Sequence, residues 1–182
     1  VSSPSYDLNL LSDGISRADF LSLSENQAKP LFNRALSGLY PPGSIVKPFI
    51  GLGALEHDVV NAGSRSVCLG HFTLPNQTHR YRDWKITGHG PVNLTQAIAE
   101  SCDVYFYELA VNIGIEGIND YLESFGFGEK LGVNFSSESE GIVPSRKWKE
   151  ENFRNPEDKI WYPGETVITG IGQGFTLTTP MQ

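Results

Sequence analysis

The chain has 182 residues, with 14 Lys and Arg against 21 Asp and Glu, so its net charge is −7 at pH 7. Such an acidic chain lacks the basic face that phosphate binding requires, and we expect no nucleic-acid partner. Hydrophobic residues make up 39% of the sequence, which is enough to bury a core, and the length predicts one domain or one large piece of a domain.

The first strongly apolar stretch runs from Ser44 to Glu56, after a polar N-terminal part that is broken by turn signals. Apolar residues cover most of its helical surface, and a helix of this kind is usually buried. A Pro-Pro-Gly run at 41–43 leads into it. Pro48 should lie near the start of the helix, where the missing N–H costs least.

The remaining elements follow from turn signals and from helical spacing of apolar residues. Residues 61–93 predict loops, and the tract from Asn93 to Gly114 predicts a helix with Asn93 as its N-cap. A short second helix should follow over 115–124. For residues 131–165 we expect mixed strand and loop, in which 147–151 form a solvated helix face. For residues 167–174 we expect the end of a strand followed by a tight turn.

The last five residues, 178–182, predict the opening of another helix, with Thr179 as its N-cap and Pro180 at its first position. Because this helix would open at the last residue of the sequence, we expect the chain to be cut from a longer one.

Ser44 and Lys47 are the candidate nucleophile and base. At a spacing of three residues, both side chains lie on one face of a helix, one turn apart. The helix N-terminus favours an alkoxide, and an apolar helix would lower the pKa of a lysine toward the range of a base. A single Ser-x-x-Lys pair also occurs by chance, with the serine as a helix cap and the lysine in solvent.

The context of this pair resembles a known family. The segment Tyr-Pro-Pro-Gly-Ser-Ile-Val-Lys-Pro-Phe at 40–49 is similar to the active-site segment of class B penicillin-binding proteins. Ser101-Cys102-Asp103 stands where the second family motif is expected. The resemblance covers nearly the whole chain, and the segments Arg-Asp-Trp-Lys at 82–85 and Gly-His-Gly at 88–90 point to the penicillin-binding protein 2 group, which serves cell elongation.

The resemblance implies an α+β fold of α/β/α layers, similar to serine β-lactamases and transpeptidases, with an antiparallel sheet flanked by helices and an incomplete C-terminal part. We expect residues 1–182 to form part of a penicillin-binding transpeptidase domain, with the strand of the third motif, a stalk domain and a membrane anchor outside the chain. The third motif, Lys-Thr-Gly, does not occur in this sequence. The chain alone should therefore lack one wall of the site and full activity.

The implied activity is that of a serine-type D,D-transpeptidase that cross-links peptidoglycan stem peptides and is acylated by β-lactams. Ser44 would attack the D-alanyl-D-alanine carbonyl, Lys47 would take the proton, Ser101 would relay a proton to the leaving amine, and Asp103 would orient the network. Asp103 stands where many relatives carry Asn, and it is expected to pair with Lys47 or Lys85. The backbone N–H of Ser44 would form half of an oxyanion hole.

Two other functions stay open at this point. A serine β-lactamase or β-lactam sensor domain would share the fold and the Ser-x-x-Lys pair, and a non-catalytic module would dock partners of the elongation machinery. The resemblance further implies a SEDS-type glycosyltransferase as partner of the intact protein, and a location at the periplasmic face of the bacterial inner membrane.

Four side chains form a candidate structural zinc site, and no cofactor is expected for the chemistry itself. Cys68, Asp83, His89 and Cys102 are all zinc-ligand types, although their spacings match no compact zinc motif. Some relatives in the penicillin-binding protein 2 group are expected to hold zinc in this region. A disulfide between the two cysteines, or neither arrangement, is the alternative, and His71 and His79 compete as ligands. The three tryptophans are expected to pack rather than to line a substrate groove.

Overall fold

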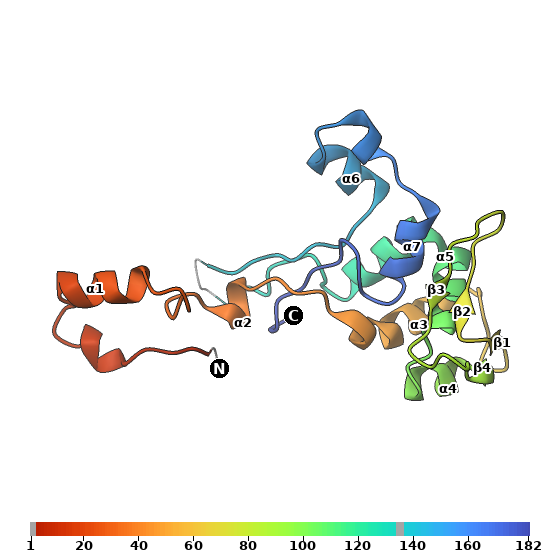
Figure 1. Cartoon of the computed structure of the whole chain (residues 1–182), viewed down its shortest axis with the longest axis horizontal. Coiled ribbons are helices and arrows are strands. Elements are labelled where there is room, and N and C mark those ends of the chain that lie inside the picture. The colour runs from red at the N-terminus through yellow and green to blue at the C-terminus, as the bar shows by residue number, and fades with distance from the viewer. Residues whose placement is uncertain (1–2, 134–136) are drawn as a thin grey trace.

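The structure is a computed structural model, and it describes residues 3–133 and 137–182. Along the chain, a first group of helices is followed by a run of short strands and then by a second group of helices (Figure 1). The described elements are η1 (Leu8–Leu11), α1 (Arg17–Ser24), α2 (Arg34–Ser37), η2 (Gly43–Val46), α3 (Lys47–Glu56), β1 (Arg65–Cys68), β2 (His71–Phe72), β3 (Tyr81–Arg82), β4 (Gly90–Asn93), α4 (Leu94–Ala99), α5 (Asp103–Ser124), α6 (Arg146–Asn152), η3 (Pro156–Lys159) and α7 (Pro163–Thr169), where η marks a 3₁₀ helix.

Helix α5 forms the centre of the fold, because it packs against both α3 and α7. Its apolar face is fully buried around Phe106, Leu109 and Leu122. The predicted helix over 44–56 is confirmed as η2 followed by α3, with Pro48 in the first turn of α3. The buried core therefore consists largely of the helix that starts near Ser44 and the helix that starts at Asp103.

The predicted helix from Asn93 to Gly114 is wrong in its continuity. Asn93 does cap a helix, in a reciprocal box with Gln96, but α4 ends at Ala99 and α5 begins at Asp103. The chain turns between them through Ser101, whose φ is +52°. Helix α5 then continues beyond Gly114, with a kink at that residue, through the short helix predicted over 115–124.

The described strands form two small antiparallel sheets. In the first, β1 pairs with β4 and places Cys68 opposite Gly90, and in the second β2 pairs with β3. Bridges also join Tyr40 to Thr178 and Ile142 to Leu177. Helices together with antiparallel strands confirm the α+β class. Residues 167–169, predicted as a strand end, lie instead in α7, while the predicted turn at 170–174 is present.

Helix α6 differs from the prediction of a solvated face. Lys147 is exposed, but Lys149 is 3% exposed, donates to the carbonyl of Ile160 at 2.7 Å and pairs with Glu165 on α7. Four aromatic rings surround its ammonium group, those of Phe153, Trp161, Tyr162 and Phe175. Phe153 directly follows α6, but the other three rings and Glu165 lie more than ten residues from Lys149, so the local sequence of α6 could not reveal the burial.

The N-terminal part reaches away from the helices of the core, and α1 stands apart at its far end (Figure 1). None of the residues of α1 is buried. At the other end of the chain, Thr179 and Gln182 exchange the two hydrogen bonds of a capping box, as predicted for a helix start. Within the described residues, no helix is both long enough and apolar enough to cross a membrane.

Candidate active site

Ser44 lies exposed in the first turn of η2, directly after the Pro-Pro-Gly run. Gly43 has a φ of +62°, and its N–H donates to the carbonyl of Gly172 at 2.9 Å. The turn after α7 is thereby fixed against the residue that precedes Ser44. Because the first N–H groups of a helix have no partner within the helix, the backbone N–H of Ser44 is suited to hold a developing oxyanion.

Lys47 is 1% exposed, although it carries an ammonium group. Its Nζ donates to Oδ1 of Asp103 at 2.6 Å, to Oγ of Ser101 at 3.0 Å and to the carbonyl oxygen of Ser101 at 3.0 Å. It also lies 5.4 Å from the centre of the Phe106 ring. Three acceptors and a ring face satisfy the buried cation, as a buried charge requires.

Ser101 connects the lysine to the candidate nucleophile. Its Oγ accepts from Lys47 and donates to Oγ of Ser44 at 3.1 Å. Among the described residues, no hydrogen bond joins Lys47 directly to Ser44, so the path between them runs through the Ser101 hydroxyl. When Lys47 is neutral, the same three atoms can carry a proton in the opposite direction, from Ser44 to the amine.

Asp103 begins α5 and pairs with Lys47; Lys85, the other expected partner, lies 4.0 Å from Glu100 instead. The structure thus brings together all four predicted catalytic residues, from η2, α3, the turn before α5 and the first residue of α5. Gly172 was missed as a member of this site. It belongs to a glycine run whose spacing does not fit a dinucleotide loop, and its close approach to Gly43 explains the glycine.

We expect Gly172→Ala to displace the turn against Ser44. An added Cβ would lie 2.3 Å from the carbonyl oxygen of Gly43, at a φ of +67°. To accommodate the methyl group, the backbone of the turn or of Gly43 must move. The substitution should therefore lower the free energy of unfolding by about 1–3 kcal/mol and slow acylation of Ser44. The matched control is Gly126→Ala, where φ is +84° but no atom lies within 4 Å. Thermal unfolding and acylation rates of both variants test this; equal effects would contradict the role of the contact.

A second cluster lies beside this site and contains the four predicted metal ligands. Their ligand atoms all lie within 4.8 Å of one another. Sγ of Cys68 lies 3.5 Å from Oδ2 of Asp83 and 3.5 Å from Nδ1 of His89, and Sγ of Cys102 lies 3.5 Å from Oδ2 of Asp83. Ligands placed tetrahedrally around zinc are separated by roughly 3.3–3.8 Å, so the donor set fits this metal.

The burial of the cluster supports the same interpretation. The side chains of Asp83 and His89 are 0% exposed, and both cysteines are buried free thiols that are not joined in a disulfide. Nε2 of His89 is buried without a hydrogen-bond partner, 3.8 Å from a carboxylate oxygen of Glu100. A metal-ligating histidine usually directs its second nitrogen to such a carboxylate. The competing His71 and His79 lie outside the cluster.

Local interactions shift the pKa values of two members of the cluster. Burial raises the pKa of Asp83, but hydrogen bonds from the backbone of Lys85 and Val104, from Cys102, and the nearby His89 outweigh it, so the pKa lies below its ordinary value. Burial also raises the pKa of the Cys102 thiol well above its ordinary value. Without a metal, the thiol therefore stays protonated at neutral pH.

The cluster is joined to the turn that carries Ser101. Cys102 follows Ser101 directly, and Oδ2 of Asp83 accepts from the backbone N–H of Val104 at 3.1 Å. The indole of Trp84, itself 64% exposed, donates to the carbonyl of Glu100 at 3.0 Å. These contacts fix both sides of the break between α4 and α5. The three tryptophans pack as expected: Trp84 lies at the surface with its ring 5.4 Å from that of His89, Trp148 packs against Phe153 and Phe175, and Trp161 is buried.

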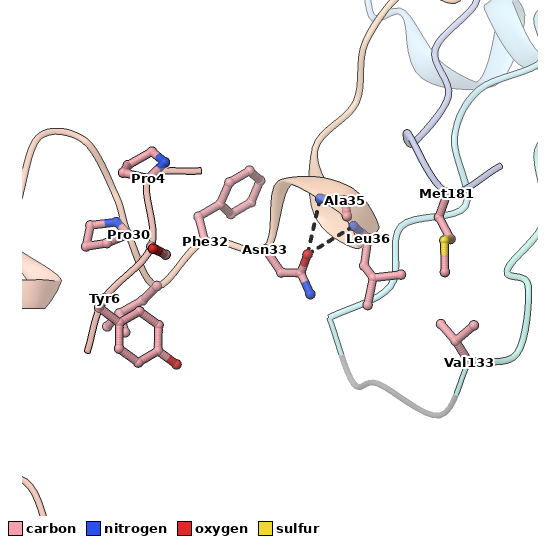
Figure 2. A pocket seen from close by; sticks show the side chains of 11 residues that line it. Pro4, Tyr6, Pro30, Phe32, Asn33, Ala35, Leu36, Val133 and Met181 are labelled. Carbon is pink, nitrogen blue, oxygen red and sulfur yellow. Dashed lines mark hydrogen bonds between the residues drawn. The ribbon is translucent and has the colours of Figure 1, made fainter. Parts of the chain in front are cut away.

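An apolar groove near the N-terminal part carries no comparable chemistry. Figure 2 shows it between the segment around Pro4 and Tyr6, helix α2 and Met181, with the side chain of Asn33 capping α2. Among the described residues that line this groove, none is a lysine, a histidine or an acid. The catalytic candidates therefore concentrate at the junction of η2, α3 and α5.

The combination of helical core, exposed serine, buried lysine and bridging second serine defines a serine acyl-transfer class of protein. A family model described as the penicillin binding protein transpeptidase domain matches residues 1–182. The chain belongs to this family.

Individual proteins that are similar to this chain are named as peptidoglycan transpeptidases. Peptidoglycan D,D-transpeptidase MrdA of Haemophilus influenzae is 44% identical over all of this chain and 27% of the relative, and that of Escherichia coli K12 is 42% identical over all of this chain and 28% of the relative. The chain thus spans roughly a quarter of the length of these curated relatives.

Solved structures show the same relationship. Pseudomonas aeruginosa PBP2, in complex with WCK 5153, matches with a TM-score of 0.92 and 46% identity over 99% of this chain and 38% of that one. PBP2 of Helicobacter pylori, in complex with MreC, matches with a TM-score of 0.90 and 42% identity over 100% of this chain and 33% of that one.

Proposed function

We propose that this chain supplies the nucleophile, the base and the proton relay of a peptidoglycan D,D-transpeptidase that β-lactams acylate. The single observation that carries the proposal is the hydrogen-bonded series Ser44–Ser101–Lys47 in a chain of the transpeptidase family. The names of the MrdA relatives support the reaction, and the fit of Asp103 to Lys47 supports the assigned roles.

The proposed reaction begins when Oγ of Ser44 attacks the carbonyl carbon between the two terminal D-alanines. Its proton passes through the Ser101 hydroxyl to a neutral Lys47, and the backbone N–H of Ser44 donates to the oxyanion. As the bond to the last D-alanine breaks, the proton returns through Ser101 to the leaving amine. The amine of a second stem peptide then attacks the acyl carbon, and its proton passes through Ser101 to Lys47. The ester bond to Oγ of Ser44 breaks, and Oγ takes this proton back along the same path, while Asp103 holds Lys47 in place throughout.

The test uses the intact protein that carries this sequence. We expect labelled penicillin to form a long-lived adduct, and peptide donor and amine acceptor to give a cross-linked product. Ser44→Ala should abolish both, whereas substitution of the exposed Ser12 to Ala should change neither. Rapid hydrolysis of the adduct without cross-linking would favour the β-lactamase alternative. No adduct and no product in the wild type would favour a non-catalytic module.

We further infer that Cys68, Asp83, His89 and Cys102 bind a structural zinc ion. Two thiolates, one imidazole and one carboxylate are a closed tetrahedral set for this metal, and the cluster is buried. The ion would hold the turn that carries Ser101 and would take no part in the acyl transfer. Elemental analysis of the purified protein should find one zinc per chain, and its absence would remove this proposal.

We also propose that the intact protein works in the cell envelope, at the periplasmic face of the inner membrane, beside a glycosyltransferase of the SEDS type. The similarity to a chain of a solved peptidoglycan synthase complex supports it, with a TM-score of 0.85 and 31% identity over 100% of this chain and 30% of that one. Co-purification of such an enzyme with the intact protein from membranes tests this partnership; a wholly soluble protein without it would contradict the proposal.

A further inference from the structure

A hollow beside the metal cluster carries positive charge that the proposed chemistry does not use. It is about 280 Å³ in volume and is lined by Gly70, His71, Arg80, Arg82, Asp83 and Ile86. Both arginines are exposed, and among the residues that the structure describes neither takes part in an ion pair. Two arginines without an ion pair thus line one hollow of a chain whose net charge is −7.

The one acid that lines the hollow does not neutralise these arginines by an ion pair. Asp83 is 4% exposed, and its carboxylate accepts from the backbone N–H groups of Lys85 and Val104. The arginines are therefore available to a ligand. Guanidinium groups bind carboxylates through two parallel hydrogen bonds, which makes a carboxylate the best matched anion for this hollow.

The segment that lines the hollow is held against the turn that carries Ser101. Strand β3 carries Arg82 and pairs with β2, which carries His71. Asp83 follows Arg82, and its carboxylate accepts a hydrogen bond from the start of α5. The indole of Trp84 donates a hydrogen bond to the carbonyl of Glu100, the residue before Ser101. Exposed apolar side chains flank this segment, with Leu69 67% and Ile86 87% exposed. This segment therefore presents both charged and apolar surface to solvent.

We propose that the Arg80–Arg82 hollow binds an internal carboxylate of a peptidoglycan stem peptide. This inference rests on the proposed function, because it takes the stem peptide as the substrate. The volume admits one carboxylate-bearing side chain rather than a whole peptide, since pockets for entire small ligands begin at about 300 Å³. The hollow is thus a specificity site, separate from the group that reacts with Ser44.

The experiment compares two stem peptides on the intact protein by calorimetry. One carries a free internal carboxylate, and in the other that carboxylate is an amide. We expect the wild type to bind the free acid at least tenfold more tightly, and the Arg80→Gln/Arg82→Gln double variant to bind both peptides equally. The control is Arg65→Gln/Arg154→Gln, which removes the same charge from two exposed positions outside the hollow and should keep the preference.

Penicillin labelling of Ser44 is measured in parallel and should be unchanged in both double variants. If the Arg80/Arg82 variant is not labelled because it misfolds, the single variants Arg80→Gln and Arg82→Gln replace it and should each reduce the preference. Equal binding of the two peptides by the wild type, or a preference that survives loss of both arginines, would overturn the inference. Failure of the wild type to react with penicillin would instead count against the proposed function.

Discussion

Replacing Lys47 with Met should slow acylation of Ser44 by penicillin by about 10²–10⁴-fold, the usual contribution of a positioned acid or base. The methionine keeps most of the buried volume but removes the proton acceptor. It also leaves Oδ1 of Asp103 and both oxygens of Ser101 without the donor that they share. The acylation rate of the intact protein, followed with fluorescent penicillin, measures the loss.

A second substitution separates catalysis from charge. Lys47→Arg keeps a cation beside Asp103, but a guanidinium does not lose its proton and cannot serve as a base. It should therefore be nearly as slow as the methionine variant. Lys147→Met is the matched control, because Lys147 is 82% exposed on α6. In this variant, Ser44 should be acylated at the wild-type rate. An arginine variant within tenfold of the wild-type rate would reject Lys47 as the base.

Loss of a metal ligand should have the second largest effect. We expect Cys102→Ser to lower zinc affinity by roughly 100-fold or more, because ligand loss exceeds the 10–100-fold cost of losing a supporting partner. It should also lower the melting temperature and slow the acylation of Ser44, since Ser101 and Asp103 flank this cysteine. Elemental analysis, thermal unfolding and penicillin labelling measure the three effects.

The control for the zinc prediction is His79→Gln, which changes an exposed histidine outside the cluster. Treatment of the wild type with a strong chelator should reproduce the effects of Cys102→Ser. Zinc affinity should also rise with pH, because the raised pKa of Cys102 means that the ion must displace a proton. A chelated protein with unchanged melting temperature and labelling would contradict a structural metal.

Local patterns were sufficient to predict the first part of the site. Ser44 and Lys47 lie within one helical turn, so helix periodicity alone brings them together. The break before α5 could not be predicted in this way, because residues 100–102 contain no Gly or Pro. Ser101 adopts a positive φ there, supported by contacts to residues that are distant in sequence.

The proximity of the four proposed zinc ligands depends still more on tertiary structure. The pairing of β1 with β4 places Cys68 opposite Gly90 and brings it to His89, and the start of α5 brings Cys102 to Asp83. The spacing of these residues along the chain could not predict their contacts, although the residue types are those that bind zinc. No sequence signal placed Glu100 next to His89, because Glu100 is an exposed acid that directly follows α4.

The most direct measurement of the central claim is the location of the covalent bond. The intact protein is treated with penicillin, digested and mapped by mass spectrometry. Attachment of one penicilloyl group at Ser44, reduced in rate when Ser101 is replaced with Ala, is the result predicted by the hydrogen-bonded path from Ser44 to Lys47. A penicilloyl group on any other residue, with Ser44 unmodified, would contradict the account.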